Sequence, residues 1–250
     1  MEVYKIMNKL SVLTLKFNHN NFTNIVHPVV VNDNTNTILI DCGYPNSLKE
    51  LKMALKENNI EFYKLSKVII THHDHDHMGN LAEIKKELPN IEIISSVIEK
   101  PYIDGRKKSL RLKQAEENYK SLPEEKKPDA YKFIELVSSL KHVNVDFTVK
   151  DGDKFSWCGG IEIIGTPGHM PGHISIYLKA FKTLVAGDEL TVVNGKLQMA
   201  NPQYTLDMKE AIKSSKKFLK YDIEDIVCYH GGEYKNNPNE ALINLEKEFN

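Results

Sequence analysis

The stretch Thr71-His72-His73-Asp74-His75-Asp76-His77-Met78-Gly79 decides how the rest of the chain is interpreted. Four of the ten histidines and two aspartates fall within six consecutive residues of it. The stretch follows Val68-Ile69-Ile70, a β-branched run that predicts a buried strand. Because neutral imidazole and carboxylate groups are preferred ligands of Zn, Fe and Mn, we expect a metal site where this strand ends.

Two rival ligand sets follow from this stretch, because alternate residues of an extended chain point to the same side. One set is His72, Asp74 and Asp76, and it needs a turn of the chain to add His77. The other set is the three histidines at positions 73, 75 and 77, which would leave a fourth metal position open. Spacing alone does not choose between the two sets.

The composition is that of an ordinary globular chain with room for one large core: 250 residues, 41% hydrophobic and 27% charged. A formal net charge of -1 gives no global field that would draw the chain to nucleic acid or to a membrane. No apolar run approaches the ~18 residues of a spanning helix, and the N-terminus has no apolar signal core, so we expect a cytoplasmic protein. The cysteines at 42, 158 and 228 lack CxxC spacing, which predicts free, buried thiols.

Strand and helix patterns alternate on both sides of one irregular stretch. The runs 29–31 and 37–40 flank a turn-rich segment and predict a hairpin. Ser47 and Glu50 predict a capping box for the helix that follows, and Thr205 is the predicted cap of a later helix. In the second half, strands are predicted at 145–149, 161–164, 174–178, 183–186 and 226–229. Strands and helices in each half predict two sheets packed face to face with helices outside.

Residues 100–141 interrupt this alternation and predict two amphipathic helices joined around Pro123. Within 100–127, nine Lys and Arg residues stand against five Asp and Glu residues, an excess of four positive charges. Such an excess is typical of a solvated helix face. It also fits a lid or pocket wall that attracts an anionic substrate, and the sequence leaves both interpretations open.

Further ligand-type residues follow three strands of the second half. His169 and His173 follow the strand 161–165, Asp188 follows 183–186, and His230 follows 226–229. A glycine beside each lets the backbone approach closely. One such residue at a strand end is unremarkable, but several in one chain predict a shared centre.

These motifs, in this order, resemble the metallo-β-lactamase superfamily. The likeness runs from Asp41-Cys42-Gly43 to His230. The family pattern Thr-His-x-His-x-Asp-His-x-Gly fits the first stretch only if His72 is its first histidine, so His73 and His75 become positions that do not bind metal. The departure is Asp74, where the family usually has histidine.

The resemblance implies a ligand for each metal position. One ion would be held by His72, Asp74 and His169, and the other by Asp76, His77 and His230, with Asp188 bridging them. His173 would be structural, and Asp41 would orient a ligand imidazole. The implied cofactors are two divalent metal ions, with Zn as first choice and Fe or Mn as alternatives.

The resemblance also implies an α+β fold, a four-layer αββα sandwich of two mixed β-sheets flanked by helices. Residues 1–250 would form a single domain of this kind, with a helical insertion at about 100–141. The implied activity is hydrolysis of an ester, lactone, thioester or phosphoester bond of a small-molecule substrate by a hydroxide that bridges the ions, with Asp76 as the catalytic residue that orients it. The alternative is a non-haem di-iron protein that binds or reduces O2 or NO. A homo-oligomer stays open.

Asp74 changes the charge that these ions would meet. A carboxylate in place of histidine makes the centre one unit less positive, so we expect weaker Lewis acids and a stronger preference for Fe or Mn at this position.

Overall fold

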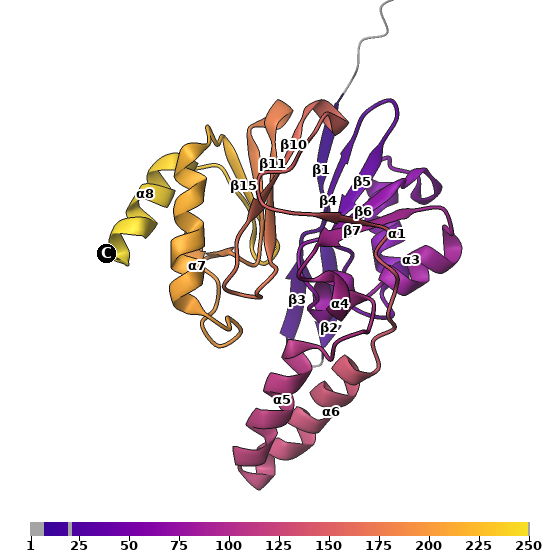
Figure 1. Ribbon diagram of the computed structural model, residues 1–250, viewed down its shortest axis with the longest axis vertical. Helices are drawn as coiled ribbons and strands as arrows, with labels where there is room; N and C mark the ends of the chain where they lie inside the picture. The colour runs from indigo at the N-terminus through magenta and orange to yellow at the C-terminus, as the bar shows by residue number, and fades with distance from the viewer. Residues whose placement is uncertain (1–7, 20–21, 250) are drawn as a thin grey trace, which may run out of the picture.

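The computed structural model describes residues 8–19 and 22–249, which form two six-stranded sheets packed face to face with helices on both outer sides (Figure 1). The first sheet has the order β1 (Lys9–Val12), β4 (Val29–Asn32), β5 (Thr37–Ile40), β6 (Lys67–Ile70), β7 (Glu92–Ser96) and β8 (Phe147–Val149). Its first three strands are antiparallel and the strands from β5 to β8 are parallel, so the sheet is mixed.

The second sheet is also mixed. Its order is β16 (Gly232–Tyr234), β15 (Asp225–Cys228), β12 (Thr183–Gly187), β11 (Ile174–Leu178), β10 (Ile161–Gly165) and β9 (Lys154–Phe155). Only β12 and β15 are paired in parallel among these described strands. Two hairpins lie outside the sheets, β2 (Leu15–His19) with β3 (Phe22–Val26) and β13 (Leu190–Val193) with β14 (Lys196–Met199).

Helices cover the outer faces, which is why the central strands are apolar on both sides. Ile38, Ile40 and Ile69 face the second sheet, while their neighbours Leu39 and Val68 face α1 (Leu48–Glu57) and α3 (Leu81–Glu87). The other outer face packs on α7 (Met208–Ser215) and α8 (Pro238–Glu248). The predicted αββα sandwich is confirmed.

Residues 100–141, called the insertion below, contain α4 (Lys100–Ile103), α5 (Leu110–Ser121) and α6 (Lys127–Ser138). The helices α5 and α6 form a hairpin that projects away from the two sheets (Figure 1). The predicted break around Pro123 falls between them. Ser109 accepts a hydrogen bond from the backbone N–H of Leu112 at 3.3 Å and so caps α5 at the base of the hairpin.

Two predicted helix caps are wrong. The helix α1 begins after Ser47 as expected, but the Ser47 hydroxyl donates to the carbonyl of Tyr44 at 2.6 Å and caps no helical N–H. The helix α7 is capped by Asp207, which accepts from the Glu210 N–H at 3.0 Å, whereas the Thr205 hydroxyl donates to the carbonyl of Asn201. In both cases the hydroxyl that was expected to cap the helix donates to a nearby backbone carbonyl instead.

All three cysteines are free and buried, as predicted. Within 8–19 and 22–249, no helix has the length and apolar character that crossing a membrane requires.

Candidate metal centre

The stretch that follows β6 changes conformation part-way along. Asp74 is extended, with φ −72° and ψ 150°, and the one-turn helix α2 (His75–Met78) begins directly after it. The sequence pattern did not predict this helix. The turn matters because it brings His77 to the side of the chain that carries Asp74 and Asp76, which an extended chain could not do.

Gly79 ends this turn and holds it against the first sheet. Its N–H donates to the carbonyl of Gly43 at 3.0 Å. A Cβ atom at position 79 would lie 2.2 Å from the backbone nitrogen of Pro45 and 2.3 Å from the carbonyl carbon of Tyr44. Only glycine, which has no Cβ atom, allows the end of α2 to approach the segment after β5 this closely.

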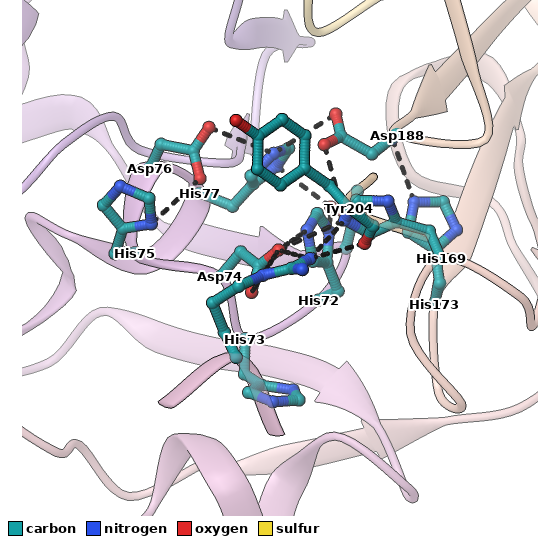
Figure 2. A network of polar contacts seen from close by, with 12 residues as sticks. His72, His73, Asp74, His75, Asp76, His77, His169, His173, Asp188 and Tyr204 are labelled. Atoms are coloured by element: carbon teal, nitrogen blue, oxygen red, sulfur yellow. Dashed lines mark hydrogen bonds and ion pairs between the residues drawn. The ribbon is translucent and has the colours of Figure 1, made fainter. Parts of the chain in front are cut away.

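Three groups of three ligand-type residues result, and the one formed by His72, His77 and Asp188 shares residues with the other two. The two groups that share no residue with each other are called the triads. The first triad is His72, Asp74 and His169, in which Asp74 Oδ2 lies 3.4 Å from His72 Nε2 and 3.1 Å from His169 Nε2. The second triad is Asp76, His77 and His230. Figure 2 shows most of these side chains turned toward one another.

The second triad is slightly wider. Asp76 Oδ2 lies 3.2 Å from His230 Nε2 and 3.8 Å from His77 Nε2. Asp188 lies between the triads: its Oδ1 is 3.3 Å from His77 Nε2, and its Oδ2 is 3.6 Å from both His169 Nε2 and His230 Nε2.

The donor atoms fit divalent metal ions. Ligand atoms bound ~2.1 Å from one tetrahedral ion lie ~3.4 Å apart, which is close to the separations in both triads. His72 Nε2, His77 Nε2 and Asp188 Oδ1 are buried and accept or donate no hydrogen bond within the described residues. Buried polar atoms of this kind call for a partner, and an ion between them would supply it.

Asp41 fixes the orientation of His77. Asp41 Oδ2 lies 2.8 Å from His77 Nδ1 and also accepts from the Thr71 hydroxyl at 2.8 Å. This contact places the proton of His77 on Nδ1 and leaves the lone pair of Nε2 for the centre. Tyr229 supports the same helix turn, because its hydroxyl donates to the Asp76 carbonyl at 2.5 Å and its ring packs on His77.

His173 lies outside both triads. Its Nε2 accepts the N–H of Asp188 at 3.0 Å, and its Nδ1 lies 2.8 Å from the Thr166 hydroxyl. Both ring nitrogens are therefore engaged in holding Asp188 and the loop before it, which is the structural role that the resemblance implies.

His73 and His75 belong to neither triad, and both contact the insertion, although His75 Nδ1 also lies 3.5 Å from Asp76 Oδ1. The ring of His73 forms a hydrogen bond with the buried Glu99 and accepts the N–H of Leu110 at 3.2 Å. His75 packs edge-on against Phe133 of α6, with 5.3 Å between ring centroids. The segment 72–77, which supplies four residues of the triads, thus also contacts the insertion.

Arg111, at the start of α5, is the residue that sequence reasoning missed. It is 4% exposed, and its Nη2 lies 2.6 Å from Asp74 Oδ2. Burial raises the pKa of Asp74, but Arg111, His169 and His72 together hold that pKa well below its usual value. The positive excess of the insertion was the available signal, but it did not single out one residue.

The family follows from a sequence match over most of the chain. A model of the metallo-β-lactamase superfamily matches residues 23–230. The chain belongs to this superfamily. It is 27% identical over 213 residues to the "Probable metallo-hydrolase YflN" of Bacillus subtilis (strain 168), a match that covers 78% of this chain and 75% of that protein.

A second relative of this superfamily chain is a hydroxyacylglutathione hydrolase of Buchnera aphidicola (subsp. Schizaphis graminum), 27% identical over 203 residues. That match covers 81% of this chain and 60% of the relative. Among solved structures, a metallo-β-lactamase family protein of Thermus thermophilus shares the fold with a TM-score of 0.71 at 18% identity, over 96% of this chain and 79% of that one. The names of these relatives agree with the hydrolase class that the sequence predicts.

Proposed function

We propose that the chain is a metal-dependent hydrolase with a dinuclear centre. The observation that carries the proposal is the pair of triads joined by Asp188, since Asp188 reaches a histidine of each triad within 3.6 Å. In this arrangement His72, Asp74 and His169 would hold one ion, Asp76, His77 and His230 would hold the other, and Asp188 is placed to serve both triads. Bound divalent ions supply a Lewis acid that polarises a carbonyl or phosphoryl oxygen.

Asp76 is the residue proposed to handle the proton. Burial raises its pKa, but His77, His75 and His230 lower it more, so the carboxylate stays ionised. An ionised carboxylate can orient an attacking water molecule and accept a proton from it. The Tyr229 hydroxyl donates to the backbone carbonyl of Asp76 and fixes the main chain that carries this side chain.

Two tyrosines close to the triads are proposed to contact the substrate. Burial and the charges of Asp76 and Asp188 raise the pKa of Tyr44, so its hydroxyl remains a hydrogen-bond donor. Tyr204 is 47% exposed and lies in front of the triads in the view of Figure 2. Because the His230 side chain is also 39% exposed, we propose that substrate reaches the centre past Tyr204 and His230.

Metal content tests the dinuclear centre. Protein produced in medium supplemented with Zn, Fe and Mn should contain two metal ions per chain by elemental analysis, with Zn as the expected metal and Fe or Mn as the alternatives. Less than one ion per chain would contradict the proposal. Replacing His142, an exposed histidine outside both triads, should leave the content unchanged.

A substrate panel tests the hydrolase activity. The panel contains small esters, lactones, thioesters and phosphodiesters, and it includes a hydroxyacylglutathione because one relative is named for hydrolysing it. Activity should be lost in His72→Ala and Asp188→Ala and kept in His142→Ala. Turnover that survives both the His72 and the Asp188 substitution would show that another site performs it.

A further inference from the structure

The first triad already faces a positive charge that belongs to the protein. Arg111 Nε lies 3.2 and 3.1 Å from the two carboxylate oxygens of Asp74, and its Nη2 lies 2.6 Å from Oδ2. The same Nη2 is 3.3 Å from His169 Nε2. Two of the three residues of this triad are therefore in contact with one guanidinium.

The guanidinium is held in place from several sides. Nη2 donates to the Tyr204 carbonyl at 2.7 Å and Nη1 donates to Gln114 Oε1 at 2.5 Å. The backbone just before it is fixed as well, because Leu110 N–H donates to His73. Hydrogen bonds thus fix Arg111 in place beside the first triad. Arg106 of the same insertion differs, because its side chain is solvated and 63% exposed.

Arg111 and a metal ion would compete for the same atoms. His169 Nε2 lies beside both Arg111 Nη2 and Asp74 Oδ2. Its lone pair can bind an ion only if Nε2 neither donates to Asp74 nor accepts an N–H of Arg111. Asp74 Oδ2 can contact Arg111 and an ion at the same time, but the two cations then share one negative charge. The Asp74–Arg111 pair is neutral, so an ion entering the first triad meets no net charge from it.

The second triad offers the opposite conditions. Asp76 pairs with His75, His77 and His230, and Asp41 stands behind His77 as a further carboxylate. Among the described ion pairs, Asp76 has no arginine or lysine partner, so an ion entering this triad meets a carboxylate that no permanent cation neutralises. It also has the more open path, since the His230 side chain is 39% exposed and that of His169 is 3% exposed.

We propose that Arg111 is a resident cation of the first triad that makes the two metal sites unequal, so that the second triad fills first and the first triad binds its ion more weakly. This inference rests on the proposed dinuclear centre. Because His169 Nε2 would have to leave Arg111 in order to bind an ion, loading of the first triad would be coupled to the base of the insertion.

A merely orienting role for Arg111 predicts the opposite result. A residue that only holds a ligand carboxylate in position increases metal affinity, and its loss costs about 10- to 100-fold. A resident cation decreases metal affinity, and its loss increases it. The sign of the effect of removing Arg111 therefore distinguishes the two roles.

The experiment is a Zn²⁺ titration of the chelator-stripped protein, followed by calorimetry and by competition with a chromophoric chelator. The wild-type chain should bind two ions with unequal affinity. In Arg111→Met the weaker site should tighten by about tenfold or more, because a buried positive charge beside the ion is gone, while the stronger site changes little. A weaker site that loses affinity or stays unchanged overturns the proposal.

Three further variants complete the test. Arg106→Met removes a solvated arginine of the insertion and should leave both affinities as in the wild type. Arg111→Lys keeps the charge and should keep the weaker site weak, which remains informative if Arg111→Met does not fold without metal. His169→Ala should remove the weaker site and His230→Ala the stronger one, and the reverse assignment would overturn the proposed order of filling.

The outcome also separates this inference from the dinuclear proposal. If the wild type binds one ion and Arg111→Met binds two, the wild-type centre is not dinuclear but Arg111 is the resident cation. If both bind one ion, both proposals fail. If both bind two ions of equal affinity, the dinuclear proposal stands and the role of Arg111 is excluded.

Discussion

The two triads have the same donor set, two histidines and one aspartate, but different surroundings. In the first triad the aspartate is paired with Arg111 from the insertion, and the side chains are 0 to 6% exposed. In the second triad the aspartate pairs only with histidines among its described ion pairs, and His230 is 39% exposed. Equal ligands therefore do not make equal sites, because affinity also depends on the charge and the solvent just outside the ligands.

The largest effect is expected from a substitution that weakens both triads at once. Asp188→Asn takes the bridging charge from both triads, so both ions should be lost and hydrolysis should fall by about 10³-fold, which corresponds to ~4 kcal/mol of transition-state stabilisation. Elemental analysis and initial rates measure this. A variant that keeps both ions would show that the triads hold metal without Asp188. Asp222→Asn, an exposed acid that pairs with Lys182, is the control.

Replacing the aspartate of each triad should have a smaller effect, which is a loss of stability that differs between the two triads. Asp74→His leaves Arg111 buried without its carboxylate, so the metal-free protein should lose about 3 kcal/mol, and its Tm should fall by roughly 6–12 °C. Asp76→His in the second triad leaves no such cation and should cost less. Thermal unfolding of the chelator-treated variants measures both. Adding Arg111→Met to Asp74→His should recover much of the loss, and an absence of recovery would contradict the Asp74–Arg111 pairing.

The link between the metal loop and the insertion can be broken without touching a triad. His73→Ala removes the partner of Glu99, which is fully buried, and the acceptor of the Leu110 N–H. We expect a loss of about 2 kcal/mol in the free energy of unfolding with two ions still bound. His75→Ala is the matched control, since it should also keep both ions and cost less. Loss of an ion in either variant would favour the three-histidine ligand set.

The smallest effect should be confined to the second triad. Tyr229→Phe removes the hydroxyl that donates to the Asp76 carbonyl and accepts the Gly43 N–H at 3.2 Å. Two buried backbone groups then lack a partner, so unfolding should require about 1–2 kcal/mol less free energy. In the Zn²⁺ titration the tighter site should weaken and the weaker site should not change. Equal weakening of both sites would mean that Tyr229 supports the whole loop.

The charge that Asp74 brings is a point where structure changes the sequence-based expectation. From the sequence, a carboxylate in place of histidine makes the centre one unit less positive. Arg111 returns that unit, because the Asp74–Arg111 pair is as neutral as an imidazole. The expected loss of Lewis acidity and the expected shift toward Fe or Mn are therefore reduced at this triad.

Local sequence patterns predicted the structure well where a single segment determines its own secondary structure. The apolar runs at 37–40 and 68–70 correspond to β5 and β6, since strands covered on both faces need continuous apolar sequence. Predictions failed where a side chain could choose between partners. Ser47 and Thr205 are suitable caps by residue type, but each hydroxyl bonds a carbonyl that the fold brings close.

The sequence by itself determined the superfamily, the two-sheet sandwich and the residues available to the triads, because ligand-type residues follow strands in a fixed order. Only the tertiary structure decided what surrounds each triad. Arg111 is 37 residues away from Asp74 along the chain, and nothing in the local pattern links them. The contact exists because His73, one residue before Asp74, holds the start of α5 against the metal loop. A charge pair of this kind depends on how distant segments pack.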